Sequence, residues 1–218
     1  MENFSLHSFN ILIHVIAGTT ALLLGVVALI SKKGRKLHNR FGRLFLYCLF
    51  IVVTTGFIGV FVFERNSILL VVTVSSTYYG FSGYRTLQTK SNIPKFIDVL
   101  AGILSILAVT YFLYYFQSSG LFWSPTITYS SVGALVFVVS YDFLKYLIPR
   151  NKYGKLWLYE HIYKMISAFT ALLSAFSGTV LDDYQPYSQF LPSVFGFSLA
   201  LSCIVFFYWK NSRAHRIT

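Results

Sequence analysis

Long apolar segments alternate with short polar ones along the whole chain. Seven segments are long enough for a helix to cross the hydrocarbon core of a bilayer, which takes about 20 residues. They cover residues 8–30, 44–63, 67–84, 96–116, 126–148, 161–181 and 190–209. This pattern predicts an all-α protein, a single bundle of seven transmembrane helices that forms one domain over residues 1–218.

The basic residues lie in alternate connections between these segments. With the first connection, residues 31–43, in the cytoplasm, 17 of the 18 lysines and arginines lie on that side and only Arg65 lies outside. Cytoplasmic connections are enriched in lysine and arginine. We therefore expect a multi-pass protein of the bacterial cytoplasmic (inner) membrane, with its N-terminus outside and its C-terminus in the cytoplasm. Spans one to three and five to seven share an outline, which is consistent with a 3+1+3 parallel repeat.

The composition supports the interpretation as a membrane protein and limits the kinds of partner to be expected. The chain is 56% hydrophobic and only 11% charged, whereas a soluble domain has about 25% charged residues. The basic residues behind the net charge of +11 lie between the apolar segments. They therefore indicate contact with anionic lipids at the cytoplasmic turns and no binding of nucleic acid. The sequence has no HExxH or GxSxG motif and no nucleotide-binding loop, and whether the protein is an enzyme stays open.

The first span carries small residues on one helical face. Ala17, Ala21 and Gly25 are four residues apart, a spacing that lets a neighbouring helix approach closely. We expect this face to pack against another span.

Three histidines at or within apolar helices are the candidates for chemistry. His14 lies inside span one, and His38 and His161 lie at the cytoplasmic ends of spans two and six. Two histidines at one depth on neighbouring helices suit axial ligation of a haem b or two ligands of a transition-metal site. The cofactor-binding prediction is therefore His14, His38 and His161, and the metal alternative adds Glu160. Each histidine could instead form only an interhelical hydrogen bond.

Other polar residues have simpler interpretations. Asp142 is followed by Lys145 on the same helical face, which predicts an ion pair within the helix. Asp98, at the start of span four, is expected at the membrane interface. Met165 follows His161 by four residues, so it is either a second ligand on that face or a packing residue.

These observations favour a redox-type membrane protein with a histidine-centred haem or metal site, and two alternatives stay open. One is a small-solute permease built from the two three-helix units, with a cavity lined by Ser75, Ser76, Tyr78, Tyr79, Ser130 and Ser131. The other is an accessory subunit of an oligomer or larger membrane complex, which predicts exposed stripes of small residues.

The histidine motifs resemble those of a known group of proteins. His14 is followed by Gly18 and Gly25 in span one, and His38 precedes Gly42-Arg43 in the first turn. A later run, residues 159–169, carries Tyr-Glu-His. Together these motifs resemble a family of bacterial multi-span membrane proteins classed as a domain of unknown function. The resemblance implies that His14, His38 and His161 are positions of interest, and it implies no reaction.

Overall fold

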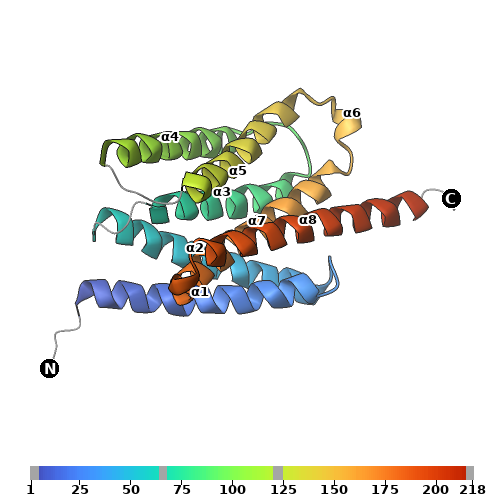
Figure 1. The fold of residues 1–218 in the computed structure, drawn as a ribbon. Helices are drawn as coiled ribbons and strands as arrows, with labels where there is room; N and C mark the ends of the chain where they lie inside the picture. Colours follow the sequence, from blue (N-terminus) through green and yellow to red (C-terminus); the bar gives the residue numbers. More distant parts are fainter. Residues whose placement is uncertain (1–4, 64–67, 120–124, 215–218) are drawn as a thin grey trace.

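The computed structural model describes residues 5–63, 68–119 and 125–214, and within these ranges the chain is helical without strands (Figure 1). The long helices are α1 (Leu6–Ile30), α2 (Lys36–Phe61), α3 (Ile68–Thr89), α4 (Phe96–Ser119), α5 (Pro125–Leu144), α7 (Leu156–Val180) and α8 (Tyr187–Ala214). Three short helices lie between them: η1 (Lys145–Leu147), α6 (Arg150–Tyr153) and η2 (Asp182–Tyr184). The all-α prediction is confirmed for these ranges. Arg65, the basic residue predicted outside, lies beyond them.

Five helices are long and apolar enough to cross a membrane: α1, α2, α4, α5 with η1, and α8. This supports the predicted membrane protein. The other two long helices, α3 and α7, are interrupted by polar and charged residues, among them Ser82 and Lys164, that are buried against other helices. Seven crossings, the orientation and the 3+1+3 repeat therefore stay predictions.

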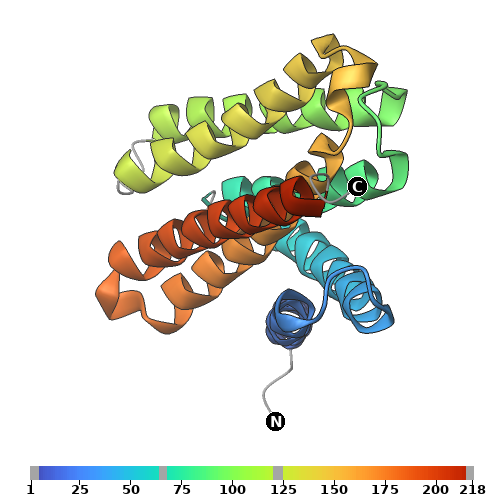
Figure 2. The ribbon, with the colours of Figure 1, turned by 90° about the vertical axis from the view of Figure 1, so that its right-hand side faces the viewer.

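The two more polar long helices lie at the centre of the bundle. α3 packs against α2, α4, α5 and α7, and α7 packs against α1, α3 and α8. In Figure 2, α4 and α5 form one layer above α3, α7 and α8, and α1 lies below these helices together with the first part of α2. A helix surrounded by others can bury polar groups as long as they find partners there. The surrounding apolar helices α1, α4 and α8 face outward, because only 22%, 22% and 11% of their most apolar segments are buried inside the bundle.

The stripe of small residues on α1 is a packing surface within the chain. Ala17, Ala21 and Gly25 are all buried. A Cβ atom added at Gly25 would lie 2.5 Å from Cδ2 of Phe169 on α7, so a larger residue here would push the Phe169 ring aside. The structure confirms the predicted close packing, and this stripe is not exposed to a partner chain.

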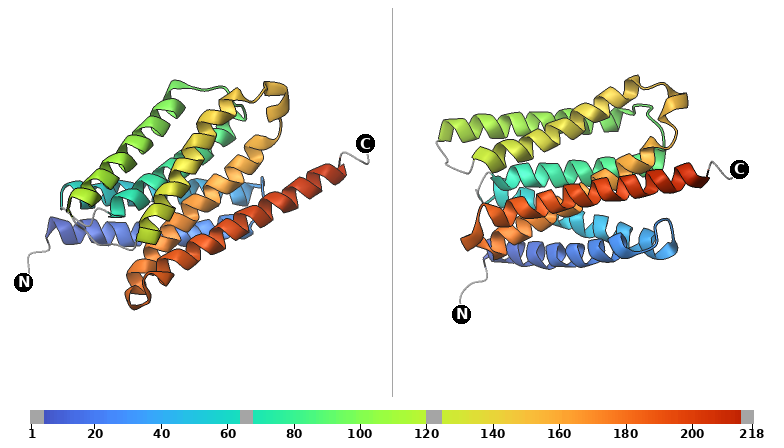
Figure 3. Two further views of the ribbon diagram at one scale, coloured as in Figure 1. Left: turned by 45° about the horizontal axis from the view of Figure 1, so that its top comes forward. Right: turned by 45° about the vertical axis from the view of Figure 1, so that its right-hand side comes forward.

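The first basic turn is shorter than the apolar pattern indicates. Gly34 adopts a positive φ of 76°, a conformation that glycine takes at little cost. α2 then begins at Lys36, eight residues before the apolar segment that was predicted from residue 44. His38 and Arg43 therefore lie near the start of α2, which turns back and packs along α1 (Figure 3).

Candidate functional site

His38 and His161 line one cavity of about 480 Å³. It lies between α1, α2, α3 and α7, at the end of the bundle that holds the turn between α1 and α2. Its walls are mainly apolar and aromatic, including Leu29, Phe45, Leu46, Tyr84, Leu87, Trp157, Met165 and Phe169. The structure thus brings together the two histidines that the sequence placed at one depth.

Both imidazoles are fixed by backbone carbonyls of a neighbouring helix. Nδ1 of His38 is 2.9 Å from the carbonyl oxygen of Ala28 on α1. Nδ1 of His161 is 3.0 Å from the carbonyl oxygen of Gly83 on α3. Because a carbonyl only accepts, each Nδ1 carries the proton, and the neutral ring keeps its lone pair on Nε2. This is the way that proteins commonly orient histidine ligands of metals.

The charged residues around this cavity are cationic. Arg43 and Lys90 line it, and none of the described residues that line it is acidic. Nζ of Lys90 lies 5.0 Å from the centre of the Trp157 ring, a cation–π contact. The cavity therefore combines apolar walls and two available imidazole nitrogens with positive charges that suit an anionic group on a ligand.

His14 lies away from this cavity. Its Nδ1 is 2.8 Å from Oγ1 of Thr55, which ties α1 to α2. Fourteen residues separate His14 from Ala28, the partner of His38, and this corresponds to about 21 Å along a helix at 1.5 Å per residue. His14 is thus in a structural hydrogen bond here, and its predicted role as a ligand is not part of the same site.

The four-residue metal alternative is not assembled. Within the ranges that the structure covers, no three His, Cys, Asp or Glu side chains form a group that could hold a metal ion. Glu160 points away from the histidines and accepts hydrogen bonds from Lys145 at 2.9 Å and from Tyr141 at 3.0 Å. Glu160 therefore belongs to a different cluster.

That cluster is a buried network of two acids and two lysines. Asp142 on α5 is paired with Lys164 on α7 and with Lys145 on η1. Lys145 also pairs with Glu160 at 2.9 Å. The four side chains are between 1% and 8% exposed. Two positive and two negative charges balance, which is the condition under which ions are buried at tolerable cost.

Hydroxyl groups form further hydrogen bonds with the charged side chains of the network. Tyr78 and Ser82 on α3 both donate to Oδ2 of Asp142 at 2.7 Å. Nζ of Lys164 donates to Oγ of Ser82 at 2.8 Å. In α6, burial and then the negative charge of Glu160 raise the pKa of Tyr153, which therefore stays a neutral phenol. The cluster joins α3, α7 and the junction of α5 with η1, near the end of the bundle that holds α6.

The sequence pattern predicts only part of this network. The predicted pair of Asp142 and Lys145 is confirmed at 2.9 Å. The link from this pair to Lys164 was not predicted, although Glu160 and Lys164 are four residues apart on an apolar helix. An acid and a base at this spacing share a helical face, so this signal could have identified a second half of the cluster.

A second ion pair lies next to the network. Arg85 binds Asp98 with two hydrogen bonds, from Nε at 2.8 Å and from Nη2 at 3.1 Å. The hydrogen bond that Arg85 donates to Asp98 raises the pKa of Arg85. A polar cavity of about 20 Å³ separates this pair from Asp142, which is room for one water molecule. Asp98 is 18% exposed, and its position at the membrane interface stays a prediction.

The hydroxyl residues predicted for a permease do not line a single cavity. Tyr78 belongs to the ion network, and Ser76 donates to the carbonyl of Val72 in its own helix at 2.7 Å. Ser75, Tyr79 and Ser131 do line one cavity, and Ser130 lines the adjoining one. The predicted set is therefore divided between the centre of the bundle and a cleft at its side.

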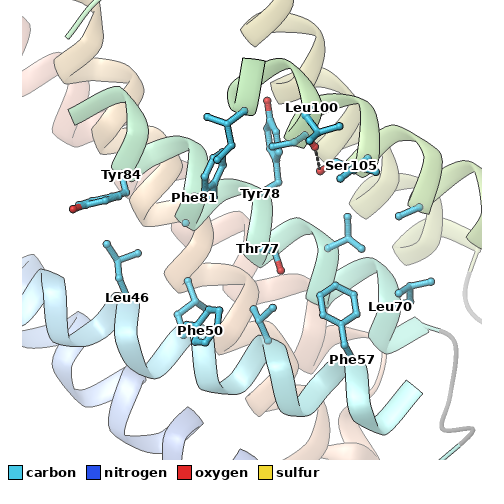
Figure 4. A pocket seen from close by; sticks show the side chains of 18 of the residues that line it. Leu46, Phe50, Phe57, Leu70, Thr77, Tyr78, Phe81, Tyr84, Leu100 and Ser105 are labelled. Atoms are coloured by element: carbon cyan, nitrogen blue, oxygen red, sulfur yellow. Dashed lines mark hydrogen bonds between the residues drawn. The ribbon is translucent and has the colours of Figure 1, made fainter. Parts of the chain in front are cut away.

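An apolar groove of about 1020 Å³ runs between α2, α3 and α4 (Figure 4). Figure 4 shows Leu46, Phe50 and Phe57 of α2 facing Phe81 and Tyr84 of α3, with Leu100 of α4 above. Arg43, Leu46 and Tyr84 line both this groove and the histidine cavity. The histidine cavity thus adjoins a surface that suits lipid chains.

Comparison with known proteins adds no assignment. No protein-family model, curated protein or solved structure matches this chain. The resemblance to a family of unknown function accordingly stays a prediction, and the case for function depends on the geometry of the histidine cavity and the buried charges.

Proposed function

We propose that this chain is a multi-pass membrane protein that binds a haem between His38 and His161 and works in electron transfer. The observation that carries the proposal is the shared cavity, in which both rings have Nδ1 tied to a carbonyl and a lone pair free on Nε2. A haem held by two histidines has both axial positions filled, and this kind of centre transfers single electrons.

The donor set favours a haem over a bare metal ion. A transition metal held only by protein usually needs three or four side-chain ligands, whereas this cavity offers two imidazoles. A haem brings four nitrogen ligands of its own and needs only the two axial ones. The cavity volume of about 480 Å³ lies within the usual range for organic ligands, about 300–1,000 Å³. Arg43 and Lys90 would pair with the haem carboxylates.

Seven crossings, with the N-terminus outside, form part of this proposal. α3 and α7 are long enough to span, and their charged residues are paired inside the bundle. Buried pairing of this kind is what allows ionisable residues in transmembrane helices. The distribution of lysine and arginine supports the orientation. In the proposed orientation, the histidine cavity lies at the cytoplasmic leaflet.

Cysteine labelling tests the orientation. In a variant with Cys48 and Cys203 replaced by serine, we expect Asp183→Cys to react with a membrane-impermeant maleimide in intact cells. Lys95→Cys should react only after the cells are opened, because both residues are exposed but on opposite sides. Equal labelling of both positions in intact cells would contradict the seven-span orientation.

Haem content tests the function. Protein purified in mild detergent from cells supplied with haem precursors should be coloured, with about one haem per chain and the spectrum of a low-spin, six-coordinate iron. Reduction with dithionite should shift that spectrum. A colourless preparation that also fails to take up added haem would rule the proposal out.

A further inference from the structure

We propose that a second cavity, between α3, α5, α7 and α8, binds a neutral amphiphile whose head carries carbonyl or hydroxyl groups. This site is separate from the histidine cavity and needs no haem. None of the described residues that line it also lines the histidine cavity.

The site consists of two adjoining cavities of about 160 and 660 Å³. They share a wall formed by Val72, Ser131, Ala134, Ser174, Ser193 and Phe197. Figure 2 shows α5 in the layer above α3, α7 and α8. Residues of all four helices line the two cavities, so the cleft lies between these layers. Together the cavities are large enough for the head and the first part of the tail of a lipid-sized molecule.

Buried polar atoms without partners lie along this cleft. Oγ of Ser75, Oγ1 of Thr128 and Oε1 of Gln189 make no hydrogen bond within the chain. Ser75 is 6% exposed and Thr128 is 2% exposed. Buried polar groups nearly always have partners, and an unsatisfied one is costly. All three residues line the cleft, so a bound molecule with donors and acceptors would satisfy these atoms once their side chains turn toward it.

The charges define which head group fits. None of the described residues that line the cleft is Lys, Arg or His, and the one charged residue among them is Asp182, at its mouth. A phosphate or carboxylate head would therefore be buried without a counter-charge, which is costly. The remaining polar groups are hydroxyls and amides, which recognise neutral carbonyl and hydroxyl groups.

The rim of the cleft indicates that the molecule comes from the bilayer. Phe190, Val194 and Phe197 of α8 line the cleft and are 41%, 45% and 54% exposed. A freely water-soluble ligand would not need such a rim, whereas an apolar tail would cover it. Quinones and diacylglycerols both have neutral oxygen-bearing heads on apolar tails.

Native mass spectrometry of the purified full chain, with haem where it is retained, tests this inference. The probes are decyl-ubiquinone and dioctanoylglycerol, added in separate titrations. We expect saturable binding of one of them, and the probe that binds identifies the class of the ligand. Thr128→Val and Ser75→Ala should each weaken binding about fivefold, since each removes one hydrogen bond to the ligand.

Matched variants separate binding from folding. Ser130 lines the same cleft, but its hydroxyl donates to the carbonyl of Ile127 at 3.1 Å; Ser130→Ala should leave affinity within about twofold. Ala134→Phe, at an exposed position on the shared wall, should block binding while the chain stays folded. His161→Ala should leave binding of the probe unchanged. Failure of both probes to saturate, or equal effects of Thr128→Val and Ser130→Ala, would overturn the proposal and leave only structural water in the cleft.

Discussion

Lys164→Met is expected to lower the free energy of unfolding by about 3–5 kcal/mol, the cost of removing one partner from a buried ion pair. Lys164 is 1% exposed, and its ammonium group neutralises Asp142 and donates to Ser82. Without it, two carboxylates share the single charge of Lys145. Reversible unfolding in mixed detergent micelles, followed by circular dichroism, measures the change.

Two variants serve as controls for this prediction. Asp142→Asn combined with Lys164→Met removes one charge of each sign and leaves the pair of Lys145 and Glu160, so we expect part of the stability to return. Lys95→Met removes an exposed lysine and should change stability by less than about 0.5 kcal/mol. A loss below about 1 kcal/mol for Lys164→Met would show that water, rather than the chain, solvates the cluster.

His38→Ala and His161→Ala are each expected to lower haem retention by at least about tenfold. Removing a group that merely orients a metal ligand costs about 10–100-fold in affinity, and loss of the ligand itself costs at least as much. Each replacement also removes a hydrogen bond to a helix carbonyl. Haem per chain after gel filtration and the spin state of the iron measure the effect.

His14→Gln is the matched control for the haem prediction. It removes an imidazole of the same kind, but one bound to Thr55 and outside the cavity. The glutamine amide can keep that hydrogen bond, so haem content should equal that of the unmodified protein. If His14→Gln lost haem while His38→Ala kept it, the ligand assignment would be wrong. Recovery of a six-coordinate spectrum in His38→Ala by added imidazole would support the assignment further.

Helix type and approximate extent followed directly from the residue pattern. Apolar runs of bilayer length are separated by short polar turns, so the positions of α1, α4, α5 and α8 could be predicted to within a few residues. The start of α2 could not, because the segment from Lys36 to Arg43 is basic and reads as a turn. It is helical since the turn is completed earlier, at Gly34 and Arg35.

The candidate sites depended on contacts between distant segments. That Asp142 pairs with Lys145 was readable because both lie on one helical face, whereas the link to Lys164 joins residues on two helices. In the same way, equal depth for His38 and His161 followed from the spans, but depth does not fix rotation about a helix axis. Only the packing of α2 on α1 and of α7 on α3 turns both rings into one cavity.

The sequence by itself determined that this chain is built of apolar helices with basic connections, because hydrophobic length and charge placement are local properties of the chain. The tertiary structure alone decided which polar side chains meet: the two histidines at their cavity, the four charges at their network and the unpartnered hydroxyls along the cleft. Those meetings depend on helix rotation and on contacts between distant segments, such as the hydrogen bonds of the network that join residues 15 and 82 positions apart, and no local pattern specifies such contacts.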